Sequence, residues 1–343
     1  MTGSFTTAED IILRGAELCR LSQKDIRRII TLKTSGSTGA NKRLYFSDKD
    51  LGHTVDFFAE GMRFMCGSGD AVLICMGNTA PDGIATLLSE GLERIGARPY
   101  IYGGIADYKD AAARCREIRP HTIVGLPSQL RRLALEAPDI QPDNVLLSAD
   151  YVALSVIETL SRIWHTKVFT HYGLTESGLG FAVQCPFLEG QHIRHDELSV
   201  EIIDPDTGEV LPVGQWGEIV FTTLRREAMP LYRYRTGDIS RLIGGVCSCG
   251  HDKPRLDRVL GRITELKKPV PIYALDELLF ACDDILDFTA SLSSKTLTVS
   301  VVGDIKKAEE LLIKAYPQYD IKVLAGSGFI THGTKKRALE ITE

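Results

Sequence analysis

The sequence lacks a long hydrophobic run and lacks an excess of positive charge. No apolar stretch approaches the ~20 residues that a membrane-spanning helix needs, so no membrane segment is expected. The 40 Lys and Arg against 45 Asp and Glu give a formal net charge of −5, which offers no general attraction to nucleic acid or anionic membranes. Residues 1–4 do not begin a basic region followed by an apolar stretch, so no secretory signal is expected.

Cysteine is not abundant, with 8 residues in a chain of 343. Most lie inside apolar stretches such as Ile74–Met76, which is typical of buried thiols in a reducing compartment. We therefore expect a cytoplasmic protein. A hydrophobic content of 44% is enough to bury a substantial core, and the length fits one large domain with a small one.

Strand-like and helix-like segments alternate over the first half of the chain. The expected elements are helix 8–31, strand 71–76, helix 85–92, strand 98–102, helix 109–118, strand 122–125, helix 127–135, strand 144–147, helix 153–163 and strand 167–169. This alternation predicts an α/β fold with a helix-covered, mostly parallel sheet. Ligands of such sheets bind beyond the carboxyl ends of the strands, where residues 171–176 follow directly.

The pattern changes near residue 198 to short strands separated by turns. The expected strands are 199–203, 217–222 and 239–243, followed by helix 272–280, strand 297–301, helix 305–315, strand 320–324 and a basic tail, 331–337. We therefore predict a large domain over 1–262, with a β-rich subdomain at about 198–260, and a small, mobile α+β C-terminal domain over 263–343.

A loop rich in hydroxyls and glycines precedes Lys42. Its members are Thr34, Ser35, Gly36, Ser37, Thr38 and Gly39. Small residues let the backbone approach a polyanion, and glycine permits turns in which successive N–H groups point one way. The loop suits the β- and γ-phosphates of a nucleotide, although it is not the usual phosphate-loop pattern. A flexible Ser/Gly linker is the alternative.

Three further motifs follow this loop in the chain. They are His171–Ser177 (HYGLTES), Tyr232–Asp238 (YRYRTGD) and Gly261–Arg262. With the loop, and in this order, they resemble the adenylate-forming superfamily of acyl- and aryl-CoA ligases, luciferases and peptide-synthetase adenylation domains. Residues 201–235 and Cys247–Gly250 are similar to the phenylacetate–coenzyme A ligase branch.

This resemblance implies an enzyme that joins a small-molecule carboxylate, aryl or acyl, to the α-phosphate of ATP and releases pyrophosphate, with Mg²⁺. The acyl group would then pass to a thiol, with coenzyme A as the family's default acceptor. Two alternatives remain open: transfer to a carrier protein, an amine or a partner enzyme, and a non-catalytic nucleotide-binding sensor or scaffold. An acyl-acceptor protein and a homodimer are both compatible with the sequence.

The resemblance also implies a role for each matching residue. Lys42 and the loop would steer the β- and γ-phosphates, Thr175 would donate to the α-phosphate, and Glu176 would help to hold Mg²⁺. Asp238 would accept hydrogen bonds from both ribose hydroxyls, and Arg262 would contact ribose or phosphate. Residues expected near the adenine are Ser148, Ala149, Asp150, Tyr172 and Gly173. Arg233 is interpreted as structural, paired with a nearby acid.

The C-terminal part departs from the family pattern. Relatives continue after Gly-Arg with two acidic residues and a glycine-containing loop that serves as hinge and lines the CoA channel. Here Thr264 replaces the hinge acid, unless Glu265 takes its place in a shifted register, and the glycine loop is absent, which leaves the transfer to CoA in question. Gly333–Arg337 resembles a motif whose lysine bridges carboxylate and α-phosphate; Lys335 is assigned to that role, with Lys336 as the alternative.

A second group of residues has the chemistry of a zinc site. Its members are Cys185, His192, Cys247 and Cys249, with His195 and His251 as competing ligands. Zinc takes four thiolate or imidazole ligands tetrahedrally, and a closed site of this kind is structural and does not activate water. The Cys-x-Cys spacing is tighter than the usual Cys-x₂-Cys, and reduced thiols near a surface turn are the alternative.

Overall fold

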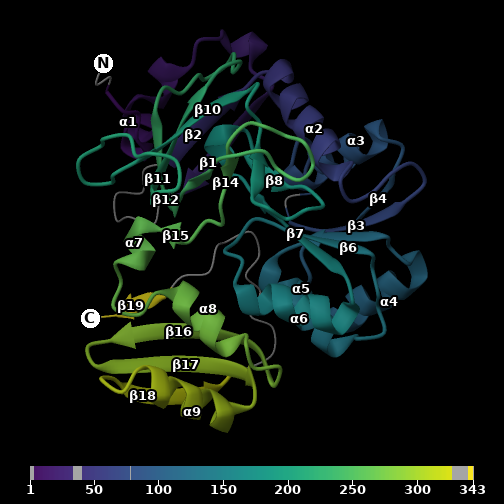
Figure 1. Cartoon of the computed structure of the whole chain (residues 1–343), viewed down its shortest axis with the longest axis vertical. Helices are drawn as coiled ribbons and strands as arrows, with labels where there is room; N and C mark the ends of the chain where they lie inside the picture. Colours follow the sequence, from purple (N-terminus) through teal and green to yellow (C-terminus); the bar gives the residue numbers. More distant parts are fainter. Residues whose placement is uncertain (1–3, 34–40, 78, 327–338, 343) are drawn as a thin grey trace. The chain divides into compact units, whose positions relative to one another are not determined.

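The computed structural model describes residues 4–33, 41–77, 79–326 and 339–342 (Figure 1). The chain divides into two compact units. Unit 1 comprises Met1–Gly67, Ala80–Gly96 and Phe169–Ile263, and unit 2 comprises Ser68–Thr79, Ala97–Val168 and Thr264–Glu343. Within the described ranges, no helix is long and apolar enough to cross a membrane.

The N-terminal part of unit 1 combines a β-hairpin with helices. Strands β1 (Arg28–Lys33) and β2 (Asn41–Phe46) pair antiparallel. The helices are α1 (Ala8–Leu18), the short 3₁₀ helix η1 (Gln23–Asp25), α2 (Asp48–Met62) and α3 (Ile84–Arg94). Thr7 and Ser47 begin α1 and α2 through capping boxes, in which each side chain accepts the backbone N–H of the aspartate three residues later. Helices α2 and α3 pack together.

The predicted helix 8–31 is wrong beyond residue 18. Cys19 has extended backbone angles and ends α1, and residues 28–33 form β1. Three isoleucines at positions 26, 29 and 30 have a helical spacing, but β-branched residues also favour strands. Pairing with β2, which begins at Asn41, decides the outcome. No local pattern contains that information.

Two groups of antiparallel strands complete unit 1. In spatial order the first contains β10 (Leu198–Ile203), β11 (Gly217–Thr223), β12 (Tyr234–Ser240) and β15 (Gly261–Arg262). The second contains β13 (Leu242–Ile243), β14 (Arg255–Leu256), β9 (Gln191–Ile193), β8 (Ala182–Gln184) and the Phe169–Tyr172 part of β7 (Lys167–Tyr172). The strands predicted at 199–203 and 217–222 are confirmed as β10 and β11.

Unit 2 contains a parallel sheet covered by helices. Its strands lie in the order β4 (Arg98–Ile101), β3 (Ala71–Cys75), β5 (Thr122–Gly125) and β6 (Asn144–Leu147), and its helices are α4 (Tyr108–Ile118), α5 (Pro127–Glu136) and α6 (Leu154–Trp164). All neighbouring pairs are parallel, and β3 and β5 are buried along their length, as expected for central strands. The predicted α/β fold class with a helix-covered parallel sheet is confirmed.

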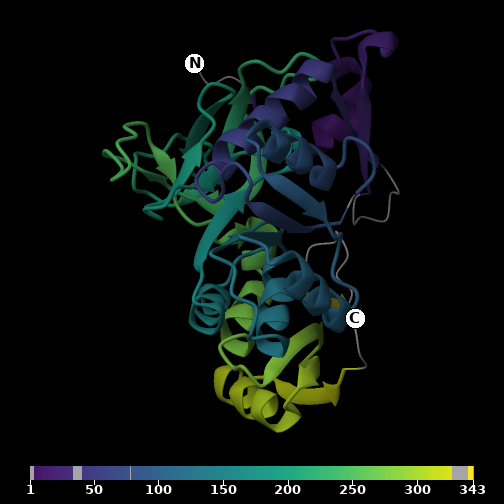
Figure 2. The same ribbon diagram turned by 90° about the vertical axis from the view of Figure 1, so that its right-hand side faces the viewer.

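The C-terminal residues of unit 2 form a small α+β module, as predicted. Its elements are α7 (Ile263–Leu266), α8 (Ile272–Leu279), β16 (Ile285–Ser293), β17 (Thr296–Gly303), α9 (Ile305–Ala315), β18 (Asp320–Ala325) and β19 (Glu340–Thr342). The strand order is β18-β17-β16-β19, and α9 packs on β17 and β18 (Figure 2). The division at residue 262 and the mobility of residues 263–343 stay predictions.

Candidate functional site

Lys42, Glu176 and Tyr234 form a buried polar cluster in unit 1. The Nζ of Lys42 donates to Oε1 of Glu176, and the phenol of Tyr234 donates to the same oxygen at 2.9 Å. The side chains of Lys42 and Glu176 are 12% and 6% exposed. Burial alone would raise the pKa of Glu176, but the charge of Lys42 and the hydrogen bonds from Lys42 and Tyr234 lower that pKa below its ordinary value. Glu176 is therefore ionised at neutral pH and paired with Lys42.

Asp238 lies buried beside this cluster. The hydroxyl of Tyr172 donates to Oδ2 of Asp238 at 2.7 Å, and Nε of Arg262 lies 3.5 Å from Oδ1. Arg262 is opposite Asp238 in the pairing of β12 with β15. Burial and the charge of Glu176 raise the pKa of Tyr234, while Arg262 opposes and Asp238 adds to that shift. The charged groups of both clusters thus act on one another and form a single site.

A short turn carries Thr175 and Glu176 beyond the carboxyl end of β7. The 3₁₀ helix η2 (Thr175–Ser177) begins three residues after that strand, and Gly178, with φ +84°, ends it. A Cβ at Gly173 would lie 2.2 Å from the carbonyl oxygen of Leu179, so only glycine fits there. The turn places Thr175 and Glu176 directly after the carboxyl end of β7.

Several predicted residues lie outside this cluster. Thr34–Gly39, Lys335 and Lys336 lie outside the described residues. Ser148, Ala149 and Asp150 belong to unit 2, where they follow β6, and Ala149 has a φ of +72°. The roles assigned to these residues stay predictions.

The sequence analysis assigned no role to Tyr234, although it lies within the YRYRTGD motif. Buried and partly exposed residues alternate along β12, so Tyr234, Thr236 and Asp238 share its buried face. Recognition of that motif as a strand would have placed Tyr234 on the same side as Asp238. Arg233 pairs with Glu201 at 2.7 Å, so the expected pairing with a nearby acid is present.

The four predicted zinc ligands come together elsewhere in unit 1. Cys185, His192, Cys247 and Cys249 place their ligand atoms within 4.8 Å of one another. The two sulfurs of Cys185 and Cys247 are 3.7 Å apart, and Sγ of Cys249 lies 3.6 Å from Nε2 of His192. Ligands of a tetrahedral zinc ion are separated by about 3.5–3.8 Å, given Zn–S and Zn–N bonds of about 2.3 and 2.0 Å. The donor set and its spacing therefore fit zinc.

The burial of the cluster also suits a metal. Burial, aided by the nearby His251, lowers the pKa of His192 to about 4, so its ring is neutral at pH 7, the form that binds metals. Pairing of β9 with β14 places Arg255 opposite His192 and so brings the Cys247–Cys249 turn to His192. The competing candidates His195 and His251 are not members of the group, and Nε2 of His195 lies 2.9 Å from the carbonyl oxygen of Pro254.

Comparison with known families gives one match to a family model. The model described as "AMP-binding enzyme" matches residues 28–225. A phenylacetate–coenzyme A ligase of Thermus thermophilus is 32% identical over 249 residues, which cover 68% of this chain and 54% of the relative. A phenylacetate–coenzyme A ligase of Aromatoleum evansii is 29% identical over 337 residues, or 90% of this chain and 74% of the relative. In the first of these alignments the chain spans about half the length of its relative.

Solved structures support the fold. The crystal structure of a 2-hydroxyisobutyryl-CoA ligase, in the postadenylation state in complex with 2-HIB-AMP, superposes with a TM-score of 0.82. The match covers 99% of this chain and 80% of that one, at 16% sequence identity. The two proteins therefore share a fold despite their divergent sequences.

Proposed function

Because the chain belongs to the AMP-binding enzyme family, we propose that it activates a carboxylic acid with ATP, forming an acyl-adenylate and pyrophosphate. The acyl group then passes to a thiol, for which coenzyme A is the default acceptor. The observation that carries the proposal is the buried Lys42–Glu176 pair, together with the Asp238–Arg262 pair of the same site. An aryl or medium acyl acid is the substrate class, as the similarity to phenylacetate–coenzyme A ligases suggests.

The chemistry requires two anions to meet, and charge develops on the pyrophosphate as it leaves. Fixed positive charge and positioning therefore provide most of the catalysis. In our proposal Lys42 and the 34–39 loop hold the β- and γ-phosphates, and the hydroxyl of Thr175 donates to the α-phosphate. Asp238 accepts hydrogen bonds from the ribose, and Arg262 contacts ribose or phosphate. Lys335 approaches the α-phosphate and the carboxylate.

Glu176 fits the role of a Mg²⁺ ligand. Its carboxylate is ionised, and hard oxygen ligands are those that Mg²⁺ prefers. In the structure Lys42 is the cation beside this carboxylate. A metal ion at Glu176 would take over that charge compensation and leave the ammonium of Lys42 to the phosphates, so both groups serve one polyanionic ligand.

The acyl acceptor has a second candidate. The segment Ile263–Pro271 lacks the glycine loop that lines the CoA channel in relatives, which favours a carrier protein, an amine or a partner enzyme as acceptor. A non-catalytic nucleotide sensor is the remaining alternative. We place this consumer of ATP in the cytoplasm, where cysteines stay reduced; none of the eight cysteines is in a disulfide.

We expect purified protein with Mg·ATP to catalyse carboxylate-dependent ATP–pyrophosphate exchange. A panel of aryl, fatty and amino acids would identify the substrate class. Lys335→Ala should lower the exchange rate by about 100-fold, because it removes a fixed charge at the transferring group. Lys336→Ala is the matched control and should leave the rate near that of the wild type, and the reverse ranking would exchange the two assignments. Nucleotide binding without exchange on any acid would favour the sensor.

We also propose that Cys185, His192, Cys247 and Cys249 hold a structural zinc ion. The four ligands close the coordination shell, so the ion would stabilise the fold and leave no open position for substrate or water. Cys185, His192 and Cys247 are buried and Cys249 is exposed, so the ion would be shielded from solvent on most sides.

Removal of zinc should therefore destabilise the protein. The purified protein should contain one zinc per chain by elemental analysis, and a chelator should lower its Tm by about 4 °C, the effect of about 3 kcal/mol in a chain of this size. Cys249→Ser should reproduce the shift, whereas Cys19→Ser, outside the cluster, should not. A zinc-free protein whose Tm does not respond to added zinc would contradict this proposal.

A further inference from the structure

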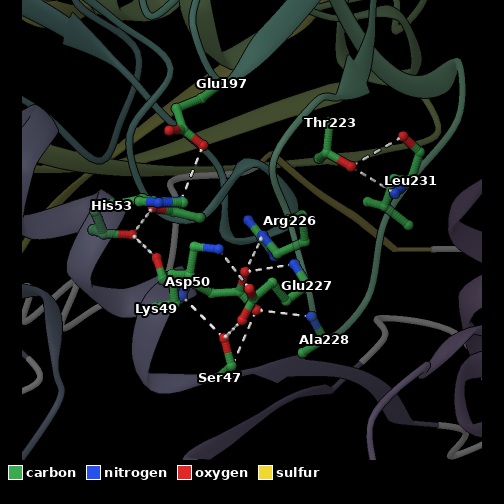
Figure 3. A network of polar contacts seen from close by, with 12 residues as sticks. Ser47, Lys49, Asp50, His53, Glu197, Thr223, Arg226, Glu227, Ala228 and Leu231 are labelled. Atoms are coloured by element: carbon green, nitrogen blue, oxygen red, sulfur yellow. Dashed lines mark hydrogen bonds and ion pairs between the residues drawn. The ribbon is translucent and has the colours of Figure 1, made fainter.

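A second network of polar contacts in unit 1 has no role in the proposed chemistry (Figure 3). Its centre is Asp50 in the first turn of α2, whose side chain is fully buried. The backbone N–H groups of Ser47, Glu227 and Ala228 donate to the Asp50 carboxylate at 2.8–3.0 Å. Nε of Arg226 lies 3.8 Å from its Oδ1. Asp50 thus fixes the segment that carries Arg226 onto the start of α2.

Arg226 contacts both elements that carry the Lys42–Glu176 pair. Its guanidinium lies over the ring of Phe46, 4.7 Å from the ring centre, at the end of the strand that carries Lys42. On the other side it packs against Gly178, which ends the turn of Glu176; a Cβ at Gly178 would lie 2.6 Å from Nη2 of Arg226. The side chain is 7% exposed, so the guanidinium fills the space between these two elements.

The same turn is attached to α2 by a second contact. Oγ1 of Thr54 donates to the carbonyl oxygen of Gly178 at 2.8 Å. Helix α2 therefore holds the end of the turn through Thr54, and Arg226 packs against Gly178 at the same end of the turn. These contacts leave little freedom for the backbone that carries Glu176.

Electrostatics connect Arg226 to the same carboxylate. Burial lowers the pKa of Arg226, and the charges of Asp50, Glu197 and Glu176 oppose this shift. Among the described residues, Nη1 of Arg226 has no hydrogen-bond partner. A buried donor without a partner is unfavourable, so an arginine here is not the choice that stability alone would favour.

We propose that Arg226 is a positioning residue for adenylation. By packing against Gly178 it supports the Thr175–Ser177 turn and so holds the Glu176 carboxylate against Lys42. The proposal rests on the function proposed above. Arg226 does not touch the reacting groups and acts through the turn and through the strand of Lys42. Asp50 in turn orients Arg226.

The test compares Arg226→Met and Arg226→Lys with Arg225→Met. Arg225 is the adjacent residue in the chain, but it is 54% exposed and pairs with Glu197, so Arg225→Met is the matched control. For Arg226→Met we expect kcat of pyrophosphate exchange to fall about 10- to 100-fold, with the KM for the carboxylate nearly unchanged, because misplacing a group by about 1 Å has effects of this size. Arg226→Lys keeps the positive charge but lacks the planar guanidinium, so its kcat should lie between that of Arg226→Met and that of the wild type.

Hydrogen exchange of the 174–180 backbone is the second measurement. In Arg226→Met these amides should exchange about tenfold faster than in the wild type, and in Arg225→Met at the wild-type rate. Folded Arg226 variants with wild-type kcat, or with lowered kcat but unchanged protection of 174–180, would overturn the positioning role. If the wild type shows no pyrophosphate exchange with any acid, the proposed function fails. The hydrogen-exchange rates of the 174–180 amides still decide whether Arg226 supports the turn. If Arg226→Met does not fold, the same two measurements on Arg226→Lys replace it.

Discussion

Replacement of Glu176 by glutamine is expected to lower the rate of pyrophosphate exchange by about 100- to 1000-fold, the effect of removing one main electrostatic group from a preorganised site. Glutamine has nearly the same shape and can still accept the hydrogen bond from Tyr234. It removes the negative charge that Lys42 faces and that Mg²⁺ would need. Glu209→Gln is the matched control, because Glu209 is exposed, and it should retain the wild-type rate.

The same variant should also be less stable at neutral pH. Removal of one partner of a buried ion pair leaves the other charge uncompensated and lowers the free energy of unfolding by about 3–5 kcal/mol. Lys42→Met alone should have a similar effect, and the double variant should lose much less than the sum of the two, as a double-mutant cycle in urea would measure. Additive losses would contradict a direct interaction between these side chains.

The pH dependence of this pair has a definite sign. The folded state lowers the pKa of Glu176, so the ionised form contributes stability above its unfolded pKa of about 4.3, and this contribution is lost as the pH falls through the lower, folded pKa. Glu176→Gln has no such group. Its stability deficit relative to the wild type should therefore shrink as the pH falls below about 4.

The helices and strands of the parallel sheet could be predicted because each is decided by local pattern. β3 is an apolar run bounded by Asp70 and Gly77, and α6 has apolar residues at helical spacing, so both were predicted within a residue or two. β1 could not be predicted, because it depends on pairing with β2, which is a separate segment of the chain. Local spacing there fits a helix equally well.

The candidate site shows the same limit. Glu176 and Asp238 were recognised through motifs, but their contacts with Tyr234 and Tyr172 join residues 58 and 66 positions apart. Asp50 and Arg226 carry no motif at all and interact although they lie 176 positions apart in the chain. The sequence thus predicts which groups perform the proposed chemistry, whereas the groups that hold them in place follow only from the fold.

The second large effect is expected at Arg131, in α5 of unit 2. Its side chain is fully buried and donates to three backbone carbonyl oxygens, those of Phe280, Cys282 and Ile285, at 2.8–3.0 Å. The guanidinium also lies 4.9 Å from the ring centre of Phe280. One arginine thus satisfies the carbonyl groups of the segment that joins α8 to β16.

Arg131→Met should lower the free energy of unfolding by about 3–5 kcal/mol, because the buried carbonyl groups of Phe280, Cys282 and Ile285 all lose the hydrogen bond from Arg131, and the Cys282 oxygen keeps the one from the N–H of Ile285. Arg162→Met is the matched control: Arg162 binds Asp283 of the same segment, but both side chains are largely exposed, so its loss should amount to about 0–1 kcal/mol. Urea unfolding followed by circular dichroism would measure both. Equal losses in the two variants would contradict the dominant role of Arg131.

The same variant tests the predicted mobility of residues 263–343. If this segment moves away from α5 during turnover, the three hydrogen bonds from Arg131 must open in each cycle, and they oppose that step. Arg131→Met would then be less stable but would show pyrophosphate exchange faster than the wild type at temperatures where it stays folded. If the segment stays on α5 throughout, weakening these bonds can only loosen the enzyme, and the rate should be unchanged or lower. Stability and rate measured on one preparation therefore distinguish a moving domain from a fixed one.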